Sequence, residues 1–130
     1  MWRWVTRGLV LTLISTLFIP ALVAQLPTEF IGALDLPDPQ ATHSGVILVR
    51  GWAFDPQQIS RIDLYIDDQF EHRALIGQPR IDISEAYPNW PGLHSTNPGF
   101  QTGLLATRFS NGPHTLYVLV RMADGRIVEL

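Results

Sequence analysis

The segment from Gly45 to Asp55, Gly-Val-Ile-Leu-Val-Arg-Gly-Trp-Ala-Phe-Asp, opens a series of short apolar runs that continues to the C-terminus. Turn-forming residues separate these runs. Several runs alternate apolar residues with polar or aromatic ones, as the stretch from Ile62 to Asp67 does. A period of two residues is typical of a β-strand that turns one face toward a core. No convincing helical pattern is present in this part of the chain, so the sequence predicts an all-β domain.

The first two dozen residues have the composition of a targeting segment. Arg3 and Arg7 form a positively charged start, and the apolar stretch from Gly8 to Ile19 is too short to span a hydrocarbon core of ~30 Å comfortably. Ala24 supplies a small residue for cleavage, although Leu22 is bulkier than is usual at its position. We therefore expect a signal peptide over residues 1–24, with an uncleaved membrane anchor as the alternative.

The rest of the chain has room for one domain. Residues 25–31 are expected to form a short leader and residues 32–130 the domain itself. The chain of 130 residues has no cysteine, so lipoprotein attachment is excluded and an exported domain must be held by its core alone. Without Arg3 and Arg7, seven arginines remain against twelve acidic residues, a net charge of −5 with histidine neutral. These arginines are scattered among acids, which argues against nucleic acid as a partner.

Seven short strands are predicted between the turns. They cover residues 31–36, 46–54, 62–66, 69–75, 100–104, 115–122 and 127–130. Asp67-Asp68 and Asp124-Gly125 are expected to turn two hairpins, and residues 76–98, rich in Pro, Gly, Asn and Ser, to form the one long loop. Seven strands in about 100 residues, with turns at nearly regular spacing, favour an immunoglobulin-like antiparallel β-sandwich of two layers.

The alternation also predicts which side chains face the core. The inward set is expected to be Ile47, Val49, Gly51 and Ala53 from one sheet, Ile62, Leu64, Ile66, Leu116, Val118 and Val120 from the other, and Phe100 and Leu104. Gly51 suits a position where another segment lies close. The same parity leaves apolar residues on the outer faces, where they need an explanation. These are Leu48, Trp52, Tyr65, Tyr117 and Leu119.

Two sets of side chains are candidate binding surfaces. Tyr65, Tyr117 and Leu119 lie on strands that neighbour each other in an immunoglobulin-type sheet, so they are expected to form an apolar patch for docking or self-association. Ordinary exposed β-forming residues are the alternative interpretation. A second binding surface is the long loop with Arg80, Tyr87 and Trp90. Flat aromatic rings cover the apolar faces of sugars, and a planar guanidinium recognises carboxylates.

Structural roles are also expected for the long loop. Arg80 and Asp82, two residues apart, are expected to pair with each other or with backbone groups and to hold the loop on the sandwich. The loop is expected to cover Trp52, which explains both an outward tryptophan and an ordered long loop. His114 is expected to bond across a turn.

Residue types used in catalysis or metal binding show no supporting pattern. The four histidines have no zinc-ligand spacing: His43, His72, His94 and His114. Ser44 follows His43, but no nucleophile motif surrounds it. Asp67, Asp68 and Glu71 cluster near one hairpin, where a solvated acidic turn is favoured over calcium because no calcium-loop spacing is present. We therefore predict no catalytic residue, no metal ligand, no cofactor and no enzymatic activity.

Several motifs occur in a fixed order along the chain. They are Gly32-Ala33-Leu34-Asp35-x-Pro37, Ser44-Gly45, Gly51-Trp52-Ala53-x-Asp55, Ile62-x-Leu64-Tyr65-Ile66-Asp67, Arg80-x-Asp82-Ile83, Ala86-Tyr87-Pro88, Gly99-Phe100 and Asn111-Gly112-x-His114-Thr115-Leu116. Together they resemble the bacterial Ig-like modules of secreted and cell-surface proteins, over Gly32 to Leu130. The resemblance implies spacer, adhesive or presentation roles and supplies no catalytic residue. Asp68 stands where an Asp-Gly turn is expected, so the turn type is left open.

The expected function is that of an exported, non-catalytic module with a binding, adhesive or spacer role. It is expected in the periplasm, at the cell surface or outside the cell, with a protein or an envelope glycan as its partner. Contact with a membrane is expected only through an uncleaved signal segment. A carbohydrate-binding module that uses Tyr87 and Trp90 is the principal alternative. A small hydrolase built on His43 or His94 is a third and weaker class, because it needs a convergent acid-base pair in a cleft.

Overall fold

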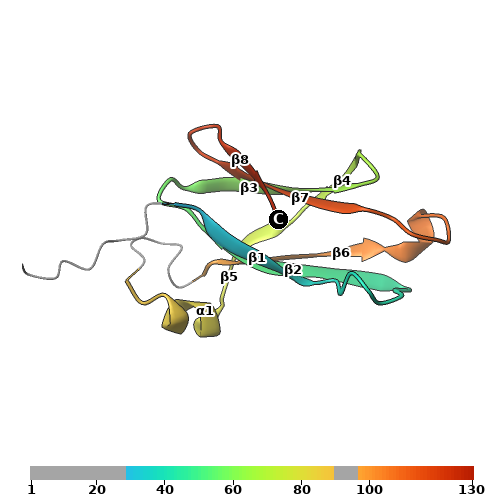
Figure 1. Ribbon diagram of the computed structural model, residues 1–130, viewed down its shortest axis with the longest axis horizontal. Coiled ribbons are helices and arrows are strands. Elements are labelled where there is room, and N and C mark those ends of the chain that lie inside the picture. Colours follow the sequence, from blue (N-terminus) through green and yellow to red (C-terminus); the bar gives the residue numbers. More distant parts are fainter. Residues whose placement is uncertain (1–28, 90–96) are drawn as a thin grey trace, which may run out of the picture.

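The computed structural model describes residues 29–89 and 97–130, which form a β-sandwich with one short helix (Figure 1). Two four-stranded antiparallel sheets pack face to face, in the strand orders β1-β2-β6-β5 and β4-β3-β7-β8. The first sheet contains β1 (Ile31–Leu36), β2 (Val46–Phe54), β5 (Leu75–Gln78) and β6 (Gly99–Leu105). The second contains β3 (Ile59–Ile66), β4 (Gln69–Arg73), β7 (Leu116–Met122) and β8 (Ile127–Glu129). The predicted two-layer antiparallel sandwich is confirmed.

The core lies between the two sheets and contains the side chains that the alternation places inward. Its buried cluster is Val49, Ala53, Ile59, Ile62, Leu64, Ile66, Phe100, Leu104, Val118, Val120 and Met122. Ile47 and Leu116, also expected inside, are only partly buried and pack against the cluster. The predicted parity of β2, β3, β6 and β7 is therefore correct, and so is the assignment of the outer faces that follows from it.

Gly51 leaves less room for a side chain than any other glycine of the described residues. A Cβ atom built there would lie 2.4 Å from the carbonyl oxygen of Ala33 and 2.5 Å from the ring of Phe100. Gly51 pairs with Leu34 on β1 and with Phe100 on β6, so the Phe100 ring occupies the space above it. The close approach predicted from the sequence is confirmed, because a side chain at this position has no room.

The region after β4 differs from the sequence prediction. The expected single strand over residues 69–75 is wrong, because β4 ends at Arg73 in the second sheet and Leu75 begins β5 in the first sheet. The expected absence of a helix, and the expected loop over all of residues 76–98, are also wrong. Part of β5 and the helix α1 (Ile81–Ala86) lie inside that range. The register of β4 on β3 shifts between Phe70 and His72, which interrupts the period of two where the strand approaches its end. A six-residue helix shows too few turns for a periodic pattern.

Two hairpin turns adopt the backbone that their residues favour. Asp67 and Asp68, between β3 and β4, have φ angles of 47° and 68°. Positive φ at both central positions is the requirement of a type I′ turn, and aspartate tolerates this region better than most residues. Gly125, with φ of 93°, turns β7 into β8 as the Asp-Gly pair predicts. The turn type left open by the sequence is thus resolved at Asp67-Asp68.

The predicted signal peptide over residues 1–24 lies outside the described residues, and the leader predicted over 25–31 is described only from residue 29. Within residues 29–89 and 97–130, no helix is both long and apolar enough to cross a bilayer. A 3₁₀ turn, η1 (Ala106–Arg108), follows β6.

Candidate functional site

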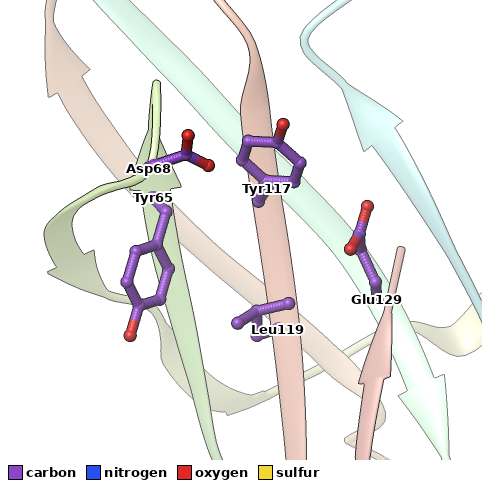
Figure 2. Close-up of a pocket in the computed structure, with 5 residues that line it drawn as sticks. All are labelled: Tyr65, Asp68, Tyr117, Leu119 and Glu129. Carbon is purple, nitrogen blue, oxygen red and sulfur yellow. The ribbon is translucent and has the colours of Figure 1, made fainter.

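The three residues predicted to form a patch on the second sheet do lie together. Tyr65 on β3 and Tyr117 on β7 are direct cross-strand partners, and Leu119 lies two residues further along β7. They line an open depression of about 320 Å³ together with Asp68 and Glu129 (Figure 2). All three apolar side chains are only half-buried. We call this group of five residues the aromatic depression.

The aromatic depression is built from three strands and one turn. Asp68 lies in the turn after β3 and Glu129 lies on β8, so the two carboxylates flank the tyrosines (Figure 2). The ring of Tyr65 also meets the ring of Phe70 on β4 edge-on, with centroids 5.7 Å apart. The helix α1 lies against the first sheet, on the opposite side of the sandwich (Figure 1). The depression therefore combines aromatic rings with exposed acids, a combination suited to cationic or hydroxyl-rich groups.

A buried carboxylate lies beside this depression on the same sheet face. Asp63, with its side chain 3% exposed, accepts hydrogen bonds from Nε of Arg61 at 3.0 Å and from Nε of Arg121 at 2.7 Å. Nε of Arg73 lies 3.5 Å from its other oxygen. The bond to Asp63, with a smaller contribution from Tyr65, holds the pKa of Arg121 above its usual value. We call Asp63 and these three arginines the arginine cluster.

The arginine cluster was not among the predicted site residues. The spacing Arg61-x-Asp63 places two opposite charges on one face of a strand, and this is the signal that the sequence offers. The contributions of Arg73 and Arg121 come from neighbouring strands, so they depend on the strand register.

The aspartate of the Gly-Trp-Ala-x-Asp motif has a structural role. The Asp55 side chain is fully buried, and one of its oxygens accepts bonds from the Gln57 amide at 2.8 Å and from Nη2 of Arg126 at 2.7 Å. Arg126 also binds Asp124 through Nε at 2.7 Å. Asp55 therefore ties the β2–β3 turn to the β7–β8 hairpin at one end of the sandwich.

Arg80 pairs with Asp82, as the sequence predicts. Two bonds join their side chains, at 2.9 and 2.8 Å, and a third bond of 2.6 Å connects Arg80 to Asp35 on β1. The guanidinium of Arg80 lowers the pKa of Asp82 to about 2, and the bond to Asp82 raises the pKa of Arg80 itself. The arginine side chain is 10% exposed. Arg80 thus connects the α1 segment to the first sheet. Its guanidinium nitrogens donate to Asp35 and Asp82 of the protein itself.

Tyr87 packs on the first sheet. Its ring centroid lies 5.6 Å from that of Trp52 and 5.8 Å from that of Phe54. The predicted covering of Trp52 by the long loop is confirmed at this contact, and Trp52 is half-buried. Trp90, the third residue of the alternative binding loop, lies outside the described residues. The two described members of that loop, Arg80 and Tyr87, both make internal contacts.

His114 bonds across a turn, as predicted. Its Nδ1 lies 2.5 Å from a carboxylate oxygen of Asp67, and its Nε2 lies 2.6 Å from the Ser110 carbonyl oxygen. Acceptors at both ring nitrogens favour the protonated ring, which donates from both. The bond to Asp67 raises the pKa of His114 most, and the bond to the Ser110 carbonyl oxygen raises it further. The pKa of Asp67 is lowered mainly by the hydrogen bond from the Thr115 amide, and further by the hydrogen bond with His114.

The remaining polar candidates do not assemble into a site. Nε2 of His43 lies 2.8 Å from the Asp38 carbonyl oxygen, and Glu71 pairs with Arg108 at 3.3 Å. In the two described ranges, no group of three or more histidine or acidic residues is arranged to hold a metal ion. The weaker calcium interpretation of Asp67, Asp68 and Glu71 gains no support from this arrangement. His94 lies outside the described residues.

Comparisons with protein-family models, with curated proteins and with solved structures find no match. The resemblance to bacterial Ig-like modules therefore stays a prediction from the motifs.

Proposed function

We propose that this chain is an exported, non-catalytic Ig-like module that binds a partner at the cell envelope or outside the cell through the outer face of its second sheet. The observation that carries the proposal is the pair of half-buried tyrosines, Tyr65 and Tyr117, around an open depression between two exposed carboxylates. Aromatic side chains with polar neighbours are enriched where proteins make specific contacts.

The strand order supports the Ig-like part of the proposal. The first sheet, β1-β2-β6-β5, has the order of the A, B, E and D strands of an immunoglobulin constant-type domain. The β3-β7-β8 part of the second sheet has the order of the C, F and G strands, with β4 added at the edge. Together with the ordered motifs over Gly32 to Leu130, this topology favours an Ig-like module over other two-sheet sandwiches.

The non-catalytic part rests on how the polar groups are used. His114 and Asp67 bond to each other, Asp63 is enclosed by arginines, and Arg80 is held by two carboxylates. These groups stabilise turns and faces of the sandwich. Export rests on the charged start and apolar stretch before Ala24. An intact mass that begins at or near Gln25 in the exported protein supports it, whereas an uncut chain in the membrane fraction contradicts cleavage.

A carbohydrate-binding role for the alternative loop is less favoured. The ring of Tyr87 packs on Trp52 and Phe54, and Arg80 is occupied by Asp35 and Asp82. A sugar at this loop would therefore depend mainly on Trp90.

The test compares three variants of the mature chain on a glycan array and in pull-downs from the native envelope. Tyr65→Ser/Tyr117→Ser is expected to remain folded by circular dichroism and to lose capture. Trp90→Ala and Leu48→Ser, the latter on the outer face of the first sheet, are expected to keep it. Protease treatment of the captured material separates protein from glycan partners. Loss of capture with Trp90→Ala, and its retention in the tyrosine variant, would assign function to the long loop and overturn the proposal.

A further inference from the structure

The outer face of the second sheet carries opposite charges in different places. In the arginine cluster, three guanidinium groups surround the single carboxylate of Asp63, which leaves an excess of two positive charges. In the aromatic depression, Asp68 and Glu129 form no ion pair with any residue of the described ranges, which leaves two negative charges. Two regions of equal and opposite charge on one face match a second copy of the same face.

The strand register places these groups in three rows across the sheet. The central row, formed by consecutive cross-strand partners on β4, β3, β7 and β8, is Arg73, Asp63, Leu119 and Glu129. The row on one side of it is Tyr65 and Tyr117, and the row on the other side is Arg61 and Arg121. With strands about 4.8 Å apart, Arg73 and Glu129 begin about 14 Å from each other. With a rise of about 3.3 Å per residue, the Cα atoms of the tyrosine row and the arginine row are about 13 Å apart. The guanidinium groups of Arg61 and Arg121 reach from their row toward Asp63 in the central row.

This near-square arrangement decides how two copies fit face to face. Their two-fold axis lies in the plane between the faces. An axis along the strands sets Arg61 over Arg121 of the other copy, and an axis across the strands sets Glu129 over Glu129. Two axes lie at about 45° to the strands, and both make the strands of the two copies cross at about 90°. The axis that runs between Arg73 and the tyrosine row pairs the outer groups with unlike ones, whereas the other diagonal sets Arg73 over the arginine row of the second copy. The first of these axes sets Arg73 between the two tyrosines of the other copy, and Glu129 between Arg61 and Arg121.

We propose that this chain forms an isologous dimer with a second copy of itself through the outer face of the second sheet, with the strands of the two copies crossed. Arg73 of each copy lies over Tyr65 and Tyr117 of the second copy, beside its Asp68. A cation is attracted to the faces of aromatic rings. Arg73 is suited to this role because its side chain is 63% exposed and makes the longest contact with Asp63. The inference goes beyond the proposed function: both use the same face, so a face engaged in the dimer is closed to the partner.

The size of the face predicts a weak dimer. Four strands at about 4.8 Å spacing and seven residues at about 3.3 Å cover roughly 20 by 23 Å, or about 450 Å² for each copy. The total of about 900 Å² is smaller than the interface of a stable complex and falls in the transient class. Association is therefore expected only at high concentration, and to weaken as salt screens the charges.

Sedimentation equilibrium of the mature chain from about 10 μM to about 1 mM tests the proposal at the concentrations that a transient interface requires. We expect a reversible monomer–dimer equilibrium. Glu129→Arg sets like charges together and is expected to lower the association constant by at least about tenfold. Arg50→Glu, a charge reversal on the outer face of the first sheet, is the matched control and is expected to leave the constant unchanged. Circular dichroism verifies that each variant is folded.

A charge-exchange mixture gives the sharper test. Arg61→Glu is expected to lose self-association, as Glu129→Arg does. In a symmetric dimer the contact between Glu129 of one copy and Arg61 of the other occurs twice, so either substitution places like charges together at both sites. When the two variants are mixed, a heterodimer is expected. At one of its two contacts the new glutamate of the first variant faces the new arginine of the second. At the other contact the native Glu129 of the first variant faces the native Arg61 of the second. A mixture of Arg50→Glu with Glu85→Arg is the control for non-specific attraction and is expected to show no gain over the wild type.

The outcomes separate this inference from the proposed function. A wild type that stays monomeric at the highest concentration, or a mixture that forms no heterodimer, overturns the dimer. Loss of envelope capture by Tyr65→Ser/Tyr117→Ser would still support the binding function in that case. A dimer insensitive to Glu129→Arg but lost in Val46→Ser/Leu105→Ser would lie on the other sheet and would overturn the inference. A dimer with the expected charge dependence, together with capture that ignores the tyrosines, supports the inference and contradicts the proposed function.

Discussion

The outer faces of the two sheets expose apolar residues in different ways. On the first sheet, Val46, Leu48 and Leu105 are 67%, 45% and 52% exposed, and Val46 and Leu105 are cross-strand partners. On the second sheet, Tyr65 and Tyr117 are half-buried between charged groups. An aliphatic face provides apolar area without direction, whereas rings set among fixed charges discriminate between partners. The exposed fraction of an apolar side chain therefore indicates a contact site less well than the arrangement of charged groups around that side chain does.

The first face is also divided along its length. Near Trp52 it is covered by the α1 segment, which Arg80 fastens to Asp35 and which places Tyr87 against the tryptophan. The aliphatic part lies toward the other end of β2, at Val46 and Leu48. On the second sheet, Tyr65 and Tyr117 line an open depression across β3 and β7. The helix α1 lies against the first sheet (Figure 1).

The largest expected effect tests the parity that defines both faces. Gly51→Val forces a side chain against the Ala33 carbonyl and the Phe100 ring, and is expected to cost about 3 kcal/mol, the upper end of the range for overpacking. Gly103→Val is the control on the outward side of the same sheet, where a Cβ meets only Val46 at 3.0 Å. Denaturant melts of both proteins measure the difference. Equal costs would contradict the assignment of Gly51 to the inner face.

The second prediction concerns the charges that distinguish the second face. Asp63→Asn removes the charge that three arginines surround, and is expected to cost about 1–3 kcal/mol because one buried acceptor oxygen becomes an NH2 donor that faces arginine donors. Asp68→Asn, on the exposed turn beside the same face, is expected to change the free energy of unfolding by less than about 0.5 kcal/mol. Urea unfolding at neutral pH compares them. A larger effect at Asp68 would contradict the structural role given to Asp63.

The third prediction is a pH dependence at the end of the second face. Because the pKa of His114 is raised above 6.5 in the folded protein, its contribution is complete below that value and is lost as the pH rises through the raised pKa. The pKa of Asp67 is lowered below 3.8, so its contribution is present above that value and is lost as the pH falls through the lowered pKa. Stability relative to His114→Gln is therefore expected to be greatest between the two ranges. Unfolding measured across pH checks this, and a flat difference would show that the pair does not stabilise the turn.

The smallest expected effect is on the aliphatic part of the first face. Val46→Thr/Leu105→Thr is expected to change the free energy of unfolding by no more than about 0.5 kcal/mol, because both side chains are already largely in water. Its effect on partner capture and on self-association is expected to be nil. The measurements are a denaturant melt and the capture assay. Loss of capture in this variant would reverse the ranking of the two faces.

The local pattern of the chain was sufficient to predict the sandwich and most of its core. Alternation shows which side of a strand is apolar, and turn residues show where strands end, so residues such as Val49, Leu64 and Val118 could be assigned to the interior from their neighbours alone. The same reasoning brought Tyr65 and Tyr117 together, because their parity and the expected strand order both place them on one face. Gly51 was identifiable because a glycine inside an apolar strand indicates a close contact.

Tertiary structure alone decided which distant side chains meet. Arg121 reaches Asp63 across 58 residues, Arg126 reaches Asp55 across 71, and Arg80 reaches Asp35 across 45. A period of two determines the face of a residue but not the register of the neighbouring strand, and a shift in that register would exchange every partner. The pattern of residues also does not show that β4 and β5 belong to different sheets. The sequence by itself therefore determined the layers and their apolar faces. The arrangement of charge on the second face arose only when the sheets paired, because it joins residues that are far apart along the chain.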